Sequence, residues 1–115
     1  MALPDIQKET VKKSLDGFYD RRIPKNIRDQ VRLSYEFRGN SATLFEDRPH
    51  WQDPKAEWSH AKVAQFRFDT ESLNWSVYCR DRNGKWHEYI GLKPTKNFSV
   101  IIHELDEDPT GSFWG

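Results

Sequence analysis

Four side chains with binding chemistry lie close together in the stretch YCRDRNGKWHEY: Tyr78, Arg80, His87 and Tyr89. Arginine binds phosphate and carboxylate groups, tyrosine offers a flat ring for stacking, and histidine can change its charge near neutral pH. The dipeptide Asn83-Gly84 in the middle of the stretch predicts a β-hairpin with a two-residue turn. This turn would set Arg80 opposite His87 and Tyr78 opposite Tyr89, so we expect them to share one face of a sheet.

Two further arginine residues are expected on the same face, because their segments also alternate polar and apolar residues. The candidate binding surface on the polar sheet face is therefore Arg38, Arg67, Tyr78, Arg80, His87 and Tyr89. Aromatic rings interleaved with arginine are typical of surfaces that bind single-stranded nucleic acid. Alternatively, the face is solvated and its cross-strand pairs only stabilise the sheet. The zero net charge of the chain favours this second interpretation of the face.

A second group of residues could bind a metal ion or support hydrolysis. His50, Asp53 and His60 lie in one segment together with Glu57. Imidazole and carboxylate groups are common metal ligands, but the segment lacks a dense spacing such as His-Glu-x-x-His. Histidine beside tryptophan in a loop can equally pack or cap, so the metal site is the weaker alternative.

The composition predicts one domain over residues 1–115 with an aromatic core. Of the 115 residues, 36% are hydrophobic and 14% are aromatic. Eighteen basic residues balance eighteen acidic ones, which argues against a strongly basic nucleic-acid binder and slightly favours a protein partner or self-association. The sequence has no glycine-rich phosphate loop, and we expect no cofactor.

Cysteine content and hydropathy bear on the compartment. The single cysteine, Cys79, cannot form an internal disulfide, which suits a reducing environment. Its alternation with Trp75 and Val77 predicts a thiol buried on the core side. No apolar run approaches the length that crosses a membrane, and the N-terminus lacks a hydrophobic signal region. We therefore expect a cytoplasmic protein without membrane association.

The polar–apolar pattern predicts an α+β fold, which is an N-terminal helix, a five-stranded antiparallel meander sheet and a C-terminal helix in two layers. The N-terminal helix and its connector occupy residues 1–27, and residues 28–115 form the rest of the domain. One helical stripe is expected to contain Ile6, Val11, Leu15 and Phe18.

Three further segments shape these expectations. Gly39-Asn40 predicts a tight turn that pairs Phe37 with Ala42. Residues 48–61 have no hydrophobic period and predict a long loop whose tryptophan residues fold back. Phe113 and Trp114 are expected to fold into the core, because a chain poor in aliphatic residues needs its aromatic ones.

The segments RLSYEFRGNSATLFEDRPHW, VAQFRF, YCRDRNGKWHEY and DEDPTGSFWG together resemble a bacterial family known as domain of unknown function 3024. The resemblance covers about residues 28–115. It implies a small bacterial protein and transfers no catalytic residue, ligand or partner.

The leading functional hypothesis is a binding or interaction module that uses the polar arginine and tyrosine face, because catalytic signatures are absent from the sequence. The alternative is a small metal-dependent hydrolase or nuclease that uses the loop with His50 and His60. A structural dimer is the third possibility.

Overall fold

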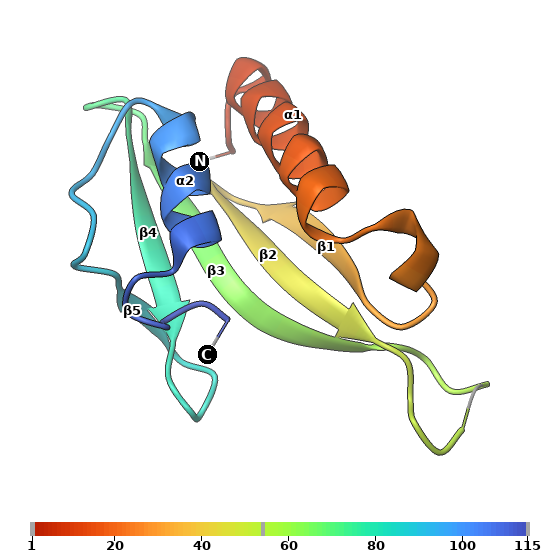
Figure 1. Cartoon of the computed structure of the whole chain (residues 1–115). Helices are drawn as coiled ribbons and strands as arrows, with labels where there is room; N and C mark the ends of the chain where they lie inside the picture. Colours follow the sequence, from red (N-terminus) through yellow and green to blue (C-terminus); the bar gives the residue numbers. More distant parts are fainter. Residues whose placement is uncertain (1, 54, 115) are drawn as a thin grey trace.

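The computed structural model describes residues 2–53 and 55–114, which form two α-helices and a five-stranded sheet (Figure 1). In chain order the elements are α1 (Asp5–Arg22), the 3₁₀ helix η1 (Lys25–Ile27), β1 (Arg32–Arg38), β2 (Ser41–Arg48), β3 (Ser59–Asp69), β4 (Asn74–Arg80), β5 (Trp86–Glu88) and α2 (Phe98–Glu107). The strands follow the order β1-β2-β3-β4-β5, and each pairs antiparallel with the next. The predicted α+β fold is confirmed.

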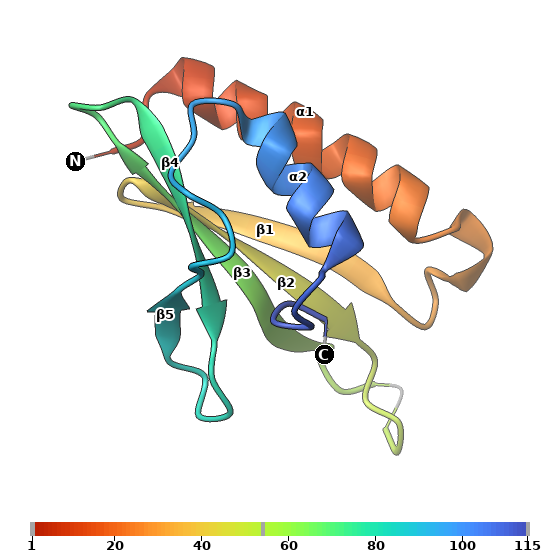
Figure 2. The same cartoon turned by 60° about the vertical axis from the view of Figure 1, so that its left-hand side comes forward.

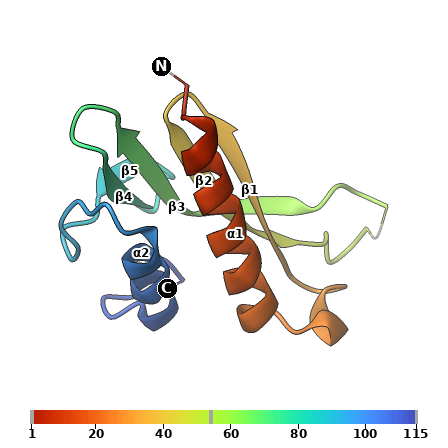
Figure 3. The same ribbon diagram turned by 90° about the horizontal axis from the view of Figure 1, so that it is seen from above.

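Both α-helices pack on the same face of the sheet (Figures 1 and 3). α1 lies over the half formed by β1 and β2, and α2 lies over the half formed by β3 and β4. The two helices run side by side across this face (Figure 2). Within residues 2–53 and 55–114 no helix covers the opposite face, which is therefore available for contacts with other molecules.

The core between the two layers is built largely from aromatic rings. The Phe98 ring of α2 lies 5.1 Å from Phe66 of β3 and 5.1 Å from Trp75 of β4, measured between centroids. Phe68 lies 5.0 Å from Trp75 in the same way. These separations are typical of favourable aromatic pairs, and all four residues are buried. A few large rings thus supply the apolar area that the low hydrophobic content would otherwise lack.

The amphipathic character of the helices was largely predicted. Val11, Leu15 and Phe18 of α1 are buried on the sheet side. Ile6 was expected on the same stripe, but its side chain is 74% exposed. Ile6 lies five positions before Val11, which rotates it about 140° around the helix and away from the core. None of the described helices is both long and apolar enough to cross a membrane.

The C-terminal residues fold back onto the core, as predicted. Phe113 is buried, and the indole N–H of Trp114 donates a hydrogen bond to the Leu105 carbonyl at 2.8 Å. Asp108 ends α2 with a positive φ of 41°, and its carboxylate accepts the backbone N–H groups of Phe113 and Trp114. The acidic exit of α2 therefore has a structural role, since it fixes the tail.

The segment 48–61 is only partly a loop, which corrects the sequence-based expectation. β2 continues to Arg48 and β3 begins at Ser59, so the two strands extend into the predicted loop. Trp58 folds back, and its ring lies 4.0 Å from the Arg32 guanidinium. Trp51 does not fold back, because its side chain is 85% exposed. The loop therefore reaches the end of the sheet and leaves its centre open.

Candidate functional site

We call the side of the sheet opposite the helices the outer sheet face. Residues that pair directly across two strands project to the same side, so the strand registers define its members. They are Arg32, Ser34, Glu36, Arg38, Ser41, Thr43, Phe45, Asp47, His60, Lys62, Gln65, Arg67, Asp69, Asn74, Ser76, Tyr78, Arg80, Trp86 and Glu88.

A β-bulge in β3 brings two basic residues to the outer sheet face. Leu44 pairs with Ala64, but Phe45 pairs with Lys62, so Val63 is an extra residue in β3. Strict alternation would place Lys62 and His60 on the core side. The bulge turns the side chains of Lys62 and His60 to the outer sheet face and leaves both Val63 and Ala64 buried. Nothing in the polar–apolar pattern marks this irregularity.

The hairpin between β4 and β5 corrects the predicted register. Asp81 donates its backbone N–H to the Lys85 carbonyl, and Gly84 donates its N–H to the Asp81 carbonyl. Gly84 has a φ of 78°, so the loop has three residues and ends in a glycine bulge, in place of the two-residue turn predicted. The pairs are consequently Tyr78 with Glu88 and Cys79 with His87.

The shift by one residue divides the predicted surface. Arg38, Arg67, Tyr78 and Arg80 lie on the outer sheet face as predicted. The predicted placement of His87 and Tyr89 on that face was wrong, because a shift of one residue turns every following side chain to the other side.

Trp86 and Glu88 take the places that were predicted for His87 and Tyr89. Trp86 contributes an aromatic ring to the outer sheet face, and the Lys62 ammonium lies 5.5 Å from its centroid. Sequence reasoning missed this pair, since it depends on both the bulge in β3 and the glycine bulge in the hairpin.

Tyr89 is buried on the core side of the sheet. Its ring lies 4.8 Å from Phe113, and its hydroxyl donates a hydrogen bond of 2.6 Å to Oε2 of Glu104. Burial, together with this hydrogen bond, raises the pKa of Tyr89. The side chain therefore joins β5 to α2 and the C-terminal tail.

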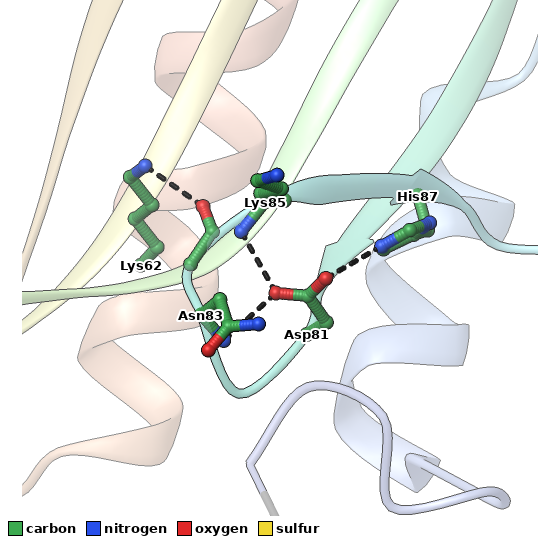
Figure 4. Close-up of polar contacts among 6 residues, drawn as sticks. Lys62, Asp81, Asn83, Lys85 and His87 are labelled. Atoms are coloured by element: carbon green, nitrogen blue, oxygen red, sulfur yellow. Dashed lines mark hydrogen bonds and ion pairs between the residues drawn. The ribbon is translucent and has the colours of Figure 1, made fainter.

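His87 lies near the hairpin loop, where it contacts Asp81 (Figure 4). The Asp81 carboxylate accepts hydrogen bonds from His87 Nε2 at 2.7 Å and from the backbone N–H groups of Asn83 and Lys85. The His87 contact is the largest cause that lowers the pKa of Asp81 to about 2. The Lys62 ammonium donates to the Gly84 carbonyl and ties the loop to β3. Asp81 thus sets the loop shape, which gives the DRNGK segment its three-residue turn.

An organised cation lies at the centre of the outer sheet face. The Arg67 guanidinium lies 3.7 Å from the Tyr78 ring centroid. Its Nε donates to Oε1 of Gln65 at 2.7 Å, and Gln65 donates in turn to the hydroxyl of buried Thr43 at 3.0 Å. Among the described residues, Nε is the only atom of the Arg67 side chain with a recorded hydrogen bond. The guanidinium is therefore held in one orientation and keeps donors for an anionic group.

A cavity of about 390 Å³ adjoins this guanidinium. Its lining comes from the β1–β2 turn, β3 with the following turn, and β4: Asn40, Arg67, Phe68, Asp69, Thr70, Ser76 and Tyr78. The cavity offers amide and hydroxyl groups beside a flat aromatic ring, so it can accept a ligand that carries both polar groups and a planar part.

A second cavity of about 290 Å³ lies on the same face and includes Ser34, Glu36, Phe45 and His60 in its lining. His60 Nδ1 lies 2.6 Å from Oδ1 of Asp47, whose side chain is only 8% exposed. A buried carboxylate of this kind orients an imidazole ring. His60 was grouped with its loop neighbours, and Asp47 was not predicted as its partner. A regular register continued from Leu44 and Ala64 would pair Asp47 with Ala61, and only the bulge at Val63 sets Asp47 opposite His60.

The candidate metal group is not assembled as a metal site. His50 Nδ1 accepts the backbone N–H groups of Gln52 and Asp53, and Asp53 caps the N–H of Lys55. His60 lies on β3, where it is held by Asp47 of β2. Over residues 2–53 and 55–114 no group of three or more His, Cys, Asp and Glu side chains is placed to hold a metal ion.

Cys79 lies on the core side of β4 but is half-buried, so the predicted full burial of its thiol was wrong. The position of Cys79 near the edge of the sheet explains this exposure. Cys79 pairs with the exposed His87 on the short edge strand β5, beyond the area that the helices cover.

Charge is unevenly distributed although the whole chain is neutral. The cationic side chains of the outer sheet face are Arg32, Arg38, Lys62, Arg67 and Arg80. Two of its acidic side chains already have partners. Asp47 contacts His60, and Asp69 at the end of β3 accepts hydrogen bonds from Glu71 and Ser72 in the following turn. Glu36 and Glu88 remain, so cations prevail on this face.

Comparison with known proteins gives one family and no further relative. No curated protein matches the chain, and no solved structure matches it. The family described as Domain of unknown function (DUF3024) matches residues 3–115, which is nearly the whole chain. The chain belongs to the DUF3024 family.

Proposed function

We propose that this protein is a non-catalytic, single-domain binding module whose outer sheet face binds single-stranded nucleic acid. The observation that carries the proposal is the Arg67 guanidinium, which is stacked on Tyr78 and oriented by Gln65 beside an open cavity. Neutral net charge by itself favoured a protein partner. The gathering of cations on the one uncovered face of the sheet favours an anionic ligand instead.

Three cation–aromatic pairs support this choice of ligand. Arg67 stacks on Tyr78, Lys62 lies near Trp86, and Arg32 lies 4.0 Å from Trp58. A single strand alternates flat bases with charged phosphates, so rings and cations side by side match both of its parts. A duplex keeps its bases stacked inside and offers only its backbone to such a surface.

The number of available cations predicts moderate, salt-dependent affinity. Arg38, Lys62, Arg67 and Arg80 can each neutralise one phosphate. Each such contact with a single strand changes the slope of log K against log salt by about −0.7, so a slope of about −3 is expected. The single half-buried cysteine supports a reducing compartment, and we infer that the module acts in the cytoplasm.

The proposal is tested by fluorescence anisotropy with labelled RNA and DNA single strands of about 12 nucleotides, and with a duplex of the same length. We expect wild-type protein to bind the single strands more tightly than the duplex. Tyr78→Ala should weaken binding by about 5- to 150-fold, because one stacked base contributes about 1–3 kcal/mol. Arg67→Ala should weaken binding and make the salt slope less steep by about 0.7.

Lys12→Ala is the matched control. Lys12 is exposed on α1, on the opposite side of the sheet, and pairs with Glu9 at 3.7 Å. Its loss changes the net charge as Arg67→Ala does and should leave binding unchanged. No binding at low salt, or equal losses in Lys12→Ala and Arg67→Ala, would contradict the proposal.

Metal-independent cleavage of bound RNA is a second candidate function, favoured by the contact between His60 and buried Asp47. In that reaction His60 would take the proton of a ribose 2′-hydroxyl, whose oxygen attacks the adjacent phosphorus. The 5′-oxygen of the next nucleotide leaves and takes up a proton from water. RNA incubated with the protein and a chelator should then be cleaved by wild type and not by His60→Ala. If wild-type protein leaves the RNA intact, cleavage is excluded and binding remains the proposed function.

A further inference from the structure

A groove between the two α-helices lies on the other side of the sheet from the proposed nucleic-acid surface. Its volume is about 330 Å³, which lies within the range of small-molecule sites. From α1, the groove is lined by Lys13, Ser14, Gly17 and Arg21. Ser14, Gly17 and Arg21 lie on a single stripe of the helix, since they recur at intervals of three and four positions, and Lys13 lies beside this stripe. The groove is therefore a property of the helix packing and not of a loop.

The second helix supplies a complementary wall. α2 contributes Ser99, Ile102, His103 and Asp106. Ile102 is buried and gives an apolar floor, whereas Ser99 and His103 are exposed at the rim. The groove thus combines hydroxyl and imidazole groups with a small apolar surface.

Positive charge predominates in the groove. Lys13 and Arg21 form no recorded ion pair within the part of the chain that the structure describes. The one carboxylate in the lining, Asp106, lies 3.8 Å from Nη1 of Arg22, which is outside the lining. Because Arg22 offsets Asp106, the cations of Lys13 and Arg21 remain for an anionic ligand.

Gly17 supplies an independent observation that concerns the shape of the groove. A glycine in the middle of a helix destabilises it relative to alanine, so its presence in α1 calls for a reason. Packing does not require it: a Cβ at position 17 would meet only the Arg21 guanidinium, at an ordinary contact distance of 3.4 Å. Its backbone is helical and needs no positive φ. A side chain here would, however, project into the groove and fill part of it.

We propose that this groove binds a small molecule with a phosphate group. The phosphate would lie between the planar guanidinium of Arg21 and the ammonium of Lys13, two groups that bind phosphate oxygens strongly. The hydroxyl of Ser14 would donate a further hydrogen bond, whereas that of Ser99 already donates to Oδ1 of Asn97 at 2.6 Å. An apolar part of the ligand would lie over Gly17 and Ile102. This site is separate from the outer sheet face and does not depend on the function proposed for it.

The test is a titration of ¹⁵N-labelled full-length protein with inorganic pyrophosphate, followed by two-dimensional NMR, with citrate as a carboxylate-only comparison. We expect saturable shifts at Lys13, Gly17, Arg21, Ser99 and His103, and weaker binding of citrate. The double variant Lys13→Ala/Arg21→Ala should lose at least about tenfold in affinity, while Lys12→Ala binds as wild type.

Gly17→Leu separates loss of the site from loss of the fold. Leucine is a better helix former than glycine, so the Tm should rise. Its side chain would displace the Arg21 guanidinium, which lies 3.4 Å from a Cβ at position 17, so pyrophosphate binding should be lost. The proposal would be overturned by unchanged binding in Gly17→Leu, by citrate binding as tightly as pyrophosphate, by shifts confined to the outer sheet face, or by no saturable binding in wild type.

Discussion

The guanidinium of Arg67 lies 3.7 Å from the centroid of the Tyr78 ring. The two residues are not direct partners, because Arg67 pairs with Ser76 and Tyr78 pairs with Gln65. Their stack is therefore a diagonal contact between β3 and β4, of the kind that long side chains make across a sheet. Gln65 completes the unit, since it faces Tyr78 in the register and accepts the Nε hydrogen bond of Arg67.

This geometry predicts that charge alone is not sufficient at position 67. Arg67→Lys keeps the positive charge but removes the planar group that stacks on Tyr78 and bonds to Gln65. We expect single-strand affinity in the anisotropy measurement to fall by about tenfold. Arg38→Lys is the matched control, because Arg38 is exposed at the end of β1, and it should change affinity less than twofold, or ~0.4 kcal/mol. Equal effects of the two substitutions would mean that Arg67 acts only as a charge.

Two glycines with different backbone conformations should respond in opposite ways to replacement by alanine. Gly84 has a φ of 78°, so Gly84→Ala should lower the free energy of unfolding by about 1 kcal/mol. Gly17 lies in α1, where Gly17→Ala should raise that free energy by about 0.5–1 kcal/mol. Urea denaturation of the two variants measures both changes. A Gly84→Ala variant as stable as wild type would contradict the three-residue loop.

The Asp81 contacts predict a loss of stability in acid. The pKa of Asp81 is about 2 in the folded protein, below its ordinary value of 3.8, chiefly because of the hydrogen bond from His87. A carboxyl with a lowered pKa stabilises the fold above pH 4 or so, and this contribution disappears as pH falls through about 2. Asp81→Asn should therefore be less stable than wild type at pH 6, and the difference should shrink as pH approaches 2. Thermal unfolding of both proteins at a series of pH values checks this. A difference that is the same at every pH would show that ionisation of Asp81 does not contribute.

The folded-back C-terminus predicts that the last residues are part of the core. Phe113 is 1% exposed and packs 4.8 Å from Tyr89 between ring centroids. Phe113→Ala should lower the free energy of unfolding by about 3 kcal/mol, as for other buried aromatic residues. Ile90→Ala is the apolar control, because Ile90 is 92% exposed, and it should change stability by no more than about 0.5 kcal/mol. A loss below about 1 kcal/mol in Phe113→Ala would mean that the tail is not firmly packed.

Much of the fold could be predicted, because the spacing of apolar residues determines which side of each helix and strand is buried. The buried residues of α2 and the pairs Phe37 with Ala42 and Tyr35 with Leu44 follow from hydrophobic spacing and from the Gly39-Asn40 turn. These features depend on local residues alone. They give the order of the elements and the side of the sheet that faces the core.

The candidate site was predicted only in part, because two bulges determine which side chains reach the outer sheet face. Hydrophobic alternation placed Arg67 and Tyr78 on the outer sheet face, since no irregularity lies between them. The extra Val63 in β3 and the glycine bulge at Gly84 each shift the register by one residue, which exchanges the faces of the residues beyond. Asn-Gly fits both a two-residue and a three-residue loop, and the Asp81 side chain that decides between them is not part of the turn pattern.

The most direct test of the central claim is a two-dimensional NMR titration of ¹⁵N-labelled protein with an RNA single strand of about 12 nucleotides. If the outer sheet face binds single-stranded nucleic acid, the largest amide shifts will be at Arg67, Tyr78 and their neighbours in β3 and β4. Residues on the exposed side of α1, including Lys12, will keep their positions. Shifts confined to the helices, or no shifts at low salt, would contradict the account.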